Sequence, residues 1–466
     1  MATLAMKTKP KTEVSLGSKI AYSFGEFGSQ FVWTTVGSYL LIFYTDVALI
    51  APVAAGNIML IARVLDGIQD LGFGYLAERT KSRWGRFRPY ILFGTPFMCF
   101  CLIIAFVSPS TGNDGKIWYA GITYVLLCFV YTVVNMSYGA LAGVMTHSSD
   151  ERLTLNWIRF IGSGLSQILL SAITMPLILF FSGVGDGETY NQSGFLWTMV
   201  VFAVVALPMF LITGAKTKEV ITLTPEQTKV PFGRTVKAVF GNKPLMCVFA
   251  MLLINLIGLF GRIGLLAFYV INNMGAPSKV AAVFGVYSLC NTAGQFIFPK
   301  FASFIGKARM LLISLGLSSI TLFAIYFADP SNFTLILLLT GVYGLAGYAA
   351  PIALSMIPDS VDYYEWKYGI RADGTSYATV SLSTKIASAV GGAVGLYIIG
   401  WFGYDGASEV GQSAQALQGI NIATNLVPAI LALIAMIPLF FYKLDTKTMD
   451  RIEEELEARR AMEVDG

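Results

Sequence analysis

Twelve runs of apolar residues, each long enough to cross a bilayer, follow one another along this chain of 466 residues. About 20 apolar residues span the hydrocarbon region as a helix. Only 13% of the residues are charged, whereas a soluble domain carries about 25%. We therefore predict an all-α membrane protein with twelve transmembrane helices. The expected spans are roughly 18–46, 52–78, 89–109, 117–146, 153–182, 195–215, 243–272, 279–299, 308–328, 333–358, 374–402 and 418–443.

Basic residues are placed asymmetrically between the two sides of the predicted bundle. The loop between the second and third spans holds Arg79, Lys81, Arg83, Arg86 and Arg88. The loops on the other side hold Lys116 and Lys279. By the positive-inside rule, both termini are expected in the cytoplasm. Residues 1–17 are polar and lysine-bearing, so we expect no cleavable signal peptide.

A polar stretch in the middle of the chain divides the predicted spans into six and six. We expect residues 1–215 to form one six-helix bundle with the cation site, 216–242 a cytoplasmic linker, and 243–443 a second bundle. Residues 444–466 are expected to form a cytoplasmic tail with a solvated helix. The charged and aromatic stretch 359–373 is expected to be a cytoplasmic loop. Two six-helix halves related by pseudo-symmetry place a substrate near the midplane between them.

Two carboxylates lie one helical turn apart in the second span. Asp66 and Asp70 are spaced i, i+4, and Arg63 precedes Asp66 by three residues, so all three share one helix face. Ionisable groups at membrane depth are costly, and they mark ion or substrate routes. This pair predicts a site for a small cation.

Polar stripes occur on two further spans. In the first span Glu26, Gln30 and Thr34 repeat every four residues, with Trp33 beside them. In the fourth span Thr132 and Asn135 lie between Tyr131 and Tyr138. Amides bind sugar hydroxyls and aromatic rings stack on sugar faces. The alternative is that both stripes form hydrogen bonds between packed helices.

Three basic residues lie within later spans. Arg159 is in the fifth and Arg262 in the seventh, and Lys385 shares a face with Tyr377 in the eleventh. A membrane-embedded cation needs a partner or a wet cavity, so these residues are candidates to bind substrate or to neutralise the acids. The alternatives are a snorkelling side chain for Arg159 and a structural ion pair between the halves for the other two.

The sequence holds no motif for catalysis. It has one histidine, His147, and five cysteines in apolar stretches, which predict free packed thiols instead of a metal cluster or a disulfide framework. Phosphate loops and nucleophile motifs are absent from the sequence. We therefore expect neither an enzyme nor a bound cofactor, and no nucleic-acid partner.

Several motifs together resemble one transporter family. They are Lys19-Ile-Ala-Tyr-Ser-Phe-Gly25, Phe43-Tyr-Thr-Asp46, Arg63-x-x-Asp66-x-x-x-Asp70, Ser82-Arg-Trp-Gly-Arg-Phe-Arg-Pro89, Arg159-Phe160, Asp362-Tyr363 and Lys385. The chain resembles, over nearly its whole length, the glycoside–pentoside–hexuronide:cation symporters, the melibiose-permease-like branch of the major facilitator superfamily. The resemblance implies a secondary active transporter of the bacterial cytoplasmic (inner) membrane.

The same resemblance implies roles for individual residues. Asp66 and Asp70 would bind the coupling cation, as metal ligands if it is Na⁺, with Thr132 as a further oxygen ligand. Arg63, Arg159 and Lys385, with Glu26, would form a charged network. The substrate set would be Gln30, Trp33, Asn135, Tyr138, Arg159, Arg262, Tyr377 and Lys385.

Three positions depart from the melibiose-type pattern. Two aspartates that hold a galactoside in such members are here Gln30 and Asn135, and the asparagine linked with sodium use is Gln69, which we keep in the cation set. Two negative charges are thus lost while Arg262 and Lys385 remain. We therefore predict an acidic glycoside such as a hexuronide, with a neutral pentoside or xylo-oligosaccharide as the alternative. The coupling ion is Na⁺ or H⁺.

Other classes remain to be weighed. A drug exporter of the same superfamily would not need the acid pair beside this loop motif. A channel does not account for two six-helix halves. A non-coupled sugar uniporter or a sensor is the further alternative, because the family's sugar aspartates are absent. A small sugar and membrane lipids are the expected partners, and the sequence does not give the oligomeric state.

Overall fold

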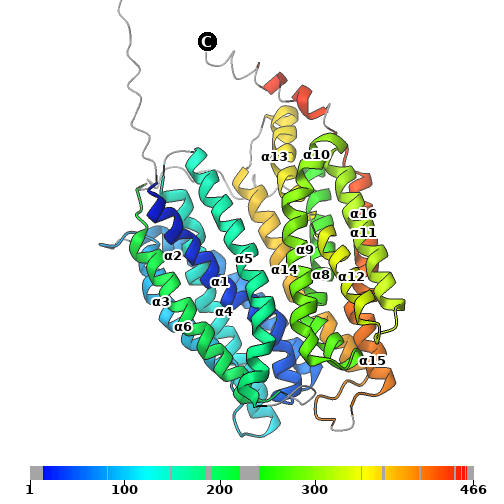
Figure 1. Ribbon diagram of the computed structural model, residues 1–466. Coiled ribbons are helices and arrows are strands. Elements are labelled where there is room, and N and C mark those ends of the chain that lie inside the picture. Colours follow the sequence, from blue (N-terminus) through cyan, green and yellow to red (C-terminus); the bar gives the residue numbers. More distant parts are fainter. Residues whose placement is uncertain are drawn as a thin grey trace, which may run out of the picture.

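The computed structural model describes residues 14–80, 82–146, 149–183, 190–220, 241–347, 349–369, 373–408, 411–445 and 448–458, apart from 453 and 457. Every regular element within these residues is a helix, as the sequence predicts. The helices form two groups that lie side by side (Figure 1).

The first half contains the first six predicted spans, whose ends agree with the prediction to within a few residues. Its elements are α1 (Leu16–Ile42) with the π-helical segment η1 (Phe43–Val47), α2 (Pro52–Arg79), α3 (Arg88–Ala105), α4 (Asn113–Val144), α5 (Ser149–Ser182) and α6 (Gln192–Lys216).

The second half repeats this plan with more interruptions. Its elements are α8 (Lys243–Phe268), η3 (Tyr269–Asn273), η4 (Pro277–Lys279), α9 (Val280–Ile297), α10 (Pro299–Ile305), α11 (Lys307–Phe327), α12 (Phe333–Ala346), α13 (Ala349–Tyr368), α14 (Asp373–Trp401), α15 (Ala414–Asn421), η5 (Ile422–Leu426) and α16 (Val427–Phe440). Helices α2 and α5 of the first half pack against α14 and α9 of the second.

Nine helices in the described chain are long and apolar enough to cross a membrane by length and composition. Helices α1, α2 and the α12–α13 pair account for the other predicted spans. Polar residues of the predicted site lie on α1 and α2, which lowers the hydropathy of these two helices.

The expected loop at 359–373 is wrong for its first part, because α13 continues to Tyr368. The helix is held there by side-chain contacts. Lys307 pairs with Asp359 at 2.7 Å, and the indole nitrogen of Trp366 donates to Glu455 at 2.6 Å. The charged composition of this segment predicts a loop, whereas these contacts with other elements hold it as a helix.

The tail is also more than a solvated helix. Residues 448–452 and 454–456 are helical, and Met449, Ile452 and Leu456 are buried against a hydrophobic cluster of the second half. Their i, i+3 and i+4 spacing places them on one helix face. The tail therefore packs onto the bundle along that face.

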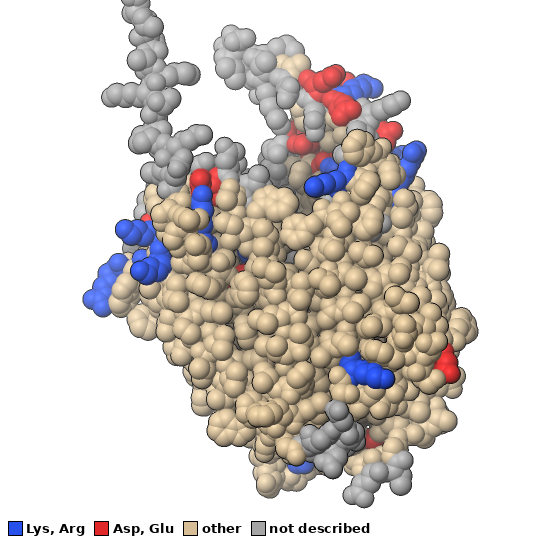
Figure 2. Space-filling model, in the orientation of Figure 1, with Lys and Arg blue, Asp and Glu red and all other residues tan. Residues whose placement is uncertain are grey.

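On the face drawn in Figure 2, charged side chains avoid a broad band. In Figure 2 they gather at the end that carries α10, α13 and the start of α1, and the face below is almost free of them. We call this end, where residues 79–88 join α2 to α3, the basic end. The uncharged band below it is what a helix bundle presents to lipid.

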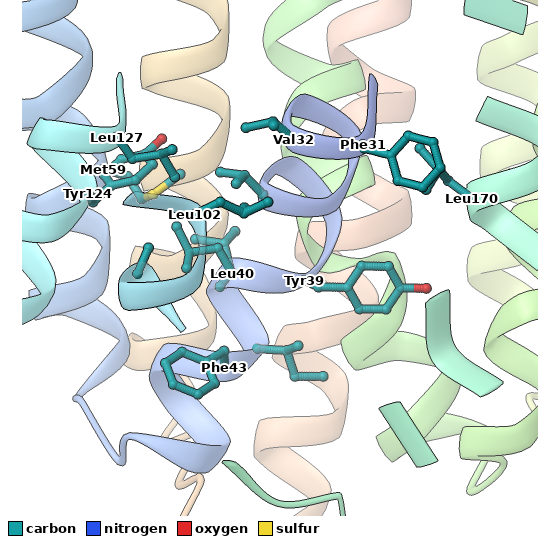
Figure 3. Close-up of a cluster of buried hydrophobic side chains, with 14 of the residues drawn as sticks. Phe31, Val32, Tyr39, Leu40, Phe43, Met59, Leu102, Tyr124, Leu127 and Leu170 are labelled. Atoms are coloured by element: carbon teal, nitrogen blue, oxygen red, sulfur yellow. The ribbon is translucent and has the colours of Figure 1, made fainter. Parts of the chain in front are cut away.

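Helix α1 lies at the centre of the first half. Phe31 packs beside Leu170 of α5, and Leu40 packs near Leu102 of α3 (Figure 3). Close approach needs a small residue at Gly25, because a Cβ there would lie 2.4 Å from the ring of Tyr138. Small residues let membrane helices approach in this way.

At the basic end, Glu219 joins the chain after α6 to the α2–α3 loop. Its carboxylate accepts backbone N–H groups of Arg86, Phe87 and Arg88 at 2.8–3.1 Å. These are donors at the start of α3, where a helix leaves N–H groups unpaired and favours negative charge. The carboxylate thus fixes the basic loop against the end of the first half.

The ends of α1 and α8 have the same backbone geometry. In each, a π-helical segment is followed by a residue with positive φ, Leu49 at 57° and Gly275 at 61°. The backbone bonds Ile50 N to Tyr44 O and Ala276 N to Val270 O also correspond. All these positions differ by 226 residues, so the two halves share a structural repeat at the end opposite the basic end.

Asp46 of η1 accepts hydrogen bonds from three hydroxyl groups at this opposite end. The donors are Thr45 at 2.6 Å, Tyr190 at 2.6 Å and Tyr404 at 2.7 Å. Thr45 and Tyr190 belong to the first half, whereas Tyr404 follows α14 in the second. We call Asp46, Tyr190 and Tyr404 the Asp46 cluster. A second bond between the halves, from the Tyr397 hydroxyl to Asn57 at 2.6 Å, lies nearby.

The Tyr404 bond should hold the halves together at this end. We expect Tyr404→Phe to shift the protein toward a form opened there, because a hydrogen bond to a charged group contributes about 1.5–3 kcal/mol, and about 1.4 kcal/mol is ten-fold in an equilibrium. Spin labels at positions 118 and 407, which are exposed at this end on opposite halves, should show a larger population of long distances.

Tyr190→Phe is the matched control for this measurement. It removes the same hydroxyl from the same carboxylate, but its bond lies within the first half. We expect the distance distribution to stay close to that of the parent protein. An equal shift in both variants would show that the Asp46 cluster acts through local stability instead of joining the halves.

Candidate functional site

A cavity of about 510 Å³ lies between α1, α2, α4 and α5 of the first half and α14 of the second. We call it the first cavity. It brings together most residues of the predicted site. The predicted residues on its wall are Glu26, Gln30, Trp33, Arg63, Asp66, Thr132, Asn135, Arg159 and Lys385.

The side chain of Asp66 contacts residues of both halves in this cavity. Its carboxylate accepts a hydrogen bond from Thr132 of α4 at 2.5 Å, and Lys385 of α14 lies 3.6 Å away. Arg63, one turn earlier on α2, is 3.9 Å away. Asp66 is only 6% exposed, so its charge depends on these partners and not on solvent.

Arg63 is held mainly by aromatic rings. Its guanidinium lies 4.4 Å from the centre of the Trp33 ring and 6.0 Å from that of Tyr124. Cation–π contacts of this kind strengthen where water is excluded. The Trp33 ring is also stacked on Tyr131 at 5.4 Å. Trp33 therefore positions the cation beside Asp66 as well as lining the cavity.

A chain of polar contacts runs from α5 through the stripe on α1. Arg159 pairs with Glu26 at 2.7 Å, and Gln30 donates to Glu26 at 2.9 Å and to Ser163 at 2.8 Å. Thr34 donates to Gln30 at 2.8 Å. The stripe thus does form helix–helix hydrogen bonds, and the same side chains line the cavity. Arg159 has an acidic partner and does not depend on snorkelling.

Asn135 is joined to α1 by a smaller cluster. Its side-chain oxygen accepts from Ser29 at 3.1 Å, and Ser29 also bonds the Tyr131 hydroxyl at 2.9 Å. Sequence reasoning did not include Ser29 or Tyr124, which also line the cavity. The spacing Tyr124, Cys128, Tyr131, Asn135 on one face of α4 was the signal for the latter.

Two predicted residues are placed off the first cavity. Tyr138 is fully buried, and its ring stacks on Tyr22 at 4.8 Å under the guanidinium of Arg159. Gln69 donates to the backbone oxygen of Phe129 at 2.6 Å. Tyr138 thus supports Arg159 from behind, and Gln69 joins α2 to α4.

Arg262 lies in the interior of the second half, 2% exposed, and lines no described cavity. Its guanidinium donates to the backbone oxygen of Thr424 at 3.0 Å and to the side chain of Asn425. The ring of Tyr343 covers it at 4.8 Å. Thr424 and Asn425 belong to η5, so Arg262 holds the π-helical part of the last span.

The side chains of Asp70 and Tyr377 lie outside the described part of the structure. The carboxylate pair and the role of Tyr377 therefore stay predictions. Among the described wall residues of the first cavity, the carboxylates are Glu26 and Asp66.

A second cavity, of about 760 Å³, lies mainly against the second half. It is bounded by α5, α8, α9, α11 and α12, and it extends to Lys300 of α10 near the basic end. The Gln30–Ser163 bond joins a wall residue of the first cavity to one of the second. The two cavities are therefore neighbours at this bond.

A helical bundle with charged residues buried between two halves is the architecture of a transporter, and comparison with known families agrees. Residues 21–446 match the family model described as MFS/sugar transport protein. The chain belongs to this family. The membership confirms the resemblance on which the sequence prediction rested, and it confirms that the chain is no enzyme.

Relatives of the same length support the assignment to the MFS/sugar transport family. An inner membrane symporter of Escherichia coli is 32% identical over 96% of each chain. An isoprimeverose transporter of Lactiplantibacillus pentosus is 30% identical over 97% of this chain and 94% of the relative. The fold is similar to that of a D-xylose–proton symporter, with a TM-score of 0.66, 13% identity and coverage of 93% and 98%. The protein is thus an integral membrane protein with the major facilitator fold.

The placement of Arg262 can be tested by removing its charge. We expect Arg262→Met to lower the Tm of the detergent-purified protein, because two buried acceptors in η5 lose their donor at a cost of about 1–3 kcal/mol each. The KM for transported sugar should stay unchanged.

Arg262→Lys gives the matched comparison, since lysine keeps the charge but lacks the planar guanidinium that donates to two acceptors in a fixed geometry. We expect an intermediate Tm. A raised KM with an unchanged Tm in either variant would instead place Arg262 at the substrate, as the sequence hypothesis had it.

Proposed function

We propose that this member of the sugar-transport family is a cation-coupled symporter that imports a glycoside by alternating access. The observation that carries the proposal is Asp66, whose carboxylate contacts Thr132 of one half and Lys385 of the other. A cation bound there would change the contacts between the halves.

The charge balance suggests how coupling would work. A buried carboxylate without a counter-charge is costly, and Lys385 supplies that charge in the structure. A bound Na⁺ or proton would replace it, which would free Lys385 and α14 to move relative to α2. Asp70, one turn further on α2, would complete the site. Sugar binding and cation binding would then favour each other by the same free energy.

The sugar would bind in the first cavity between Gln30, Asn135 and Trp33. Gln30 and Asn135 offer amide groups to hydroxyls, and Trp33 offers the part of its ring that Arg63 and Tyr131 leave uncovered. Cavities of this size with a few convergent polar groups are typical small-molecule sites.

We place the basic end, and both termini with it, in the cytoplasm. Arg79, Arg83, Arg86 and Arg88 lie at this end, whereas Lys116 and Lys279 lie at the other. The positive-inside rule then orients the bundle. The structure, joined at the opposite end by the Asp46 cluster, would be a state closed to the outside. The membrane would be the bacterial cytoplasmic membrane, as for the Escherichia coli relative.

The arrangement of charges favours a neutral glycoside. Each basic residue on the wall of the first cavity already faces a carboxylate: Arg159 faces Glu26, and Arg63 and Lys385 face Asp66. Arg262, on which the prediction of an acidic sugar partly rested, lies off both cavities. An acidic glycoside such as a hexuronide is the second candidate, because the described wall carries three cations and two carboxylates.

Gradient-driven uptake into proteoliposomes tests the function. We expect labelled sugar to accumulate under an imposed Na⁺ or H⁺ gradient. We expect Asp66→Asn to abolish this accumulation, because the neutral amide has no negative charge with which to bind the coupling cation. Thr132→Val separates the ions: it should weaken the dependence on Na⁺ several-fold if Thr132 is a ligand, and change little if H⁺ is used.

Asp114→Asn is the matched control, since this exposed carboxylate begins α4 and faces neither cavity. Its uptake should equal that of the parent protein. Facilitated entry without accumulation under either gradient would contradict symport and favour a uniporter.

A second assay separates the two substrate classes. We expect a neutral glucoside to accumulate more than the glucuronide of the same aglycone, because the carboxylates of Glu26 and Asp66 already pair with the cations. Competition for uptake at equal concentrations measures the ratio. A preference for the glucuronide that is lost in Arg159→Gln would establish the acidic alternative.

A further inference from the structure

The second cavity holds unpaired polar groups that the proposed sugar site does not use. Gln167 of α5 and Asn255 of α8 both line it. Neither side-chain amide has a hydrogen-bond partner in the described protein, although both are half-buried at membrane depth. Their polar atoms are accessible from the cavity, so water or a hydroxylated ligand there can pair with them.

These two amides come from opposite halves of the protein. A group between them would contact both halves at once, as substrate does between the halves of such transporters. Two further wall amides are bonded to each other, because Gln295 donates to Asn291 at 2.5 Å, and the amide of Asn156 is exposed. Gln167 and Asn255 are therefore the half-buried wall amides without a hydrogen-bond partner among the described residues.

Much of the remaining wall is aromatic. Trp157 of α5 and Phe296 of α9 are stacked at 6.1 Å, and Tyr287 and Tyr343 are stacked at 5.7 Å. Among the described wall residues, Lys300 at the end near α10 is the charged one. Amides between aromatic faces suit a neutral sugar ring, which has hydroxyls at its rim and apolar faces.

The two cavities meet where Gln30 bonds Ser163. A ligand that occupied both cavities would lie beside this bond. The first cavity carries carboxylates and basic groups, whereas the described wall of the second is uncharged apart from Lys300 at one end, so the two parts of such a ligand would be recognised by different chemistry. A single sugar ring in the first cavity would leave Gln167 and Asn255 unpaired.

We propose that the second cavity binds the second sugar unit of a neutral disaccharide, and that Gln167 and Asn255 determine specificity for it. The proposal rests on the function proposed above and names its substrate class. The first unit lies in the first cavity, and the glycosidic linkage passes beside Gln30 and Ser163. An alkyl aglycone would not pair with the two amides, because it has no hydrogen-bonding groups.

The test compares ligands that share their first unit. Matched pairs are methyl α-xyloside with isoprimeverose, methyl β-glucoside with cellobiose, and methyl α-galactoside with melibiose. For the pair that is transported, we expect the disaccharide to bind more tightly. Gln167→Leu and Asn255→Leu should each weaken the disaccharide by about five-fold, the effect of one hydrogen bond, and leave the methyl glycoside unchanged.

Two variants calibrate the result. Asn135→Leu, in the first cavity, should weaken both members of a pair equally. Gln418→Leu makes the same change as Gln167→Leu at an exposed site outside both cavities, and should change neither. Retained binding of the methyl glycoside also shows that a variant is folded, and Asn255→Ala replaces any variant that fails this check.

Failure of this inference is distinct from failure of the proposed function. Transport with equal effects of Gln167→Leu on both members of every pair would overturn the second-unit site alone. A butyl glycoside that binds as tightly as the disaccharide, with no effect of either substitution, would assign the cavity to an apolar aglycone and overturn it too. Uptake of the glucuronide alone would overturn this inference and leave the symporter proposal standing. No uptake of any pair or of the glucuronide under either gradient would overturn both.

Discussion

The contact between Asp66 and Lys385 is the constraint on which the rest of the structure depends. A carboxylate that is 6% exposed cannot keep its charge without a partner, and its partner comes from the other half of the molecule. Thr132 fixes one carboxylate oxygen, and Arg63, held against Trp33, adds positive charge nearby. The arrangement of the halves and the charge of the site are therefore linked by one short network.

At the opposite end of the bundle a second carboxylate, Asp46, also joins the halves, but its partners are hydroxyl groups. Asp46 is buried among donors from both halves, and the same π-helical backbone ends α1 and α8 at corresponding positions. A π-helical segment widens the helix and redirects the chain, and such segments are frequent at functional sites. Carboxylates thus join the halves at two levels: by an ion pair at the first cavity and by hydrogen bonds near the membrane surface.

Much of this fold could be predicted from the sequence, because apolar length decides where helices cross a membrane. The spans agree with the structure except where charge misled the prediction. Residues 359–368 are charged yet helical, since Lys307 and Glu455 hold Asp359 and Trp366 from other elements. The charged residues of the site could be predicted, because charge at membrane depth is costly and therefore rare, so Asp66, Glu26 and Arg159 stand out in apolar sequence. Ser29, Gln167 and Asn255 could not be singled out, because single neutral polar residues are common in such helices.

The sequence by itself determined the number and order of the helices, the family, and which acidic and basic residues lie within membrane-spanning segments. It could do so because the free energy of burying apolar residues and the cost of placing charge in a membrane are both properties of a single segment. Only the tertiary structure decided the partners. It paired Asp66 with Lys385 and turned Arg262 away from the cavities to hold η5. It also left the amides of Gln167 and Asn255, in one cavity, without a hydrogen-bond partner among the described residues. Such pairings join residues more than a hundred positions apart, and helix packing alone brings them within reach of a hydrogen bond.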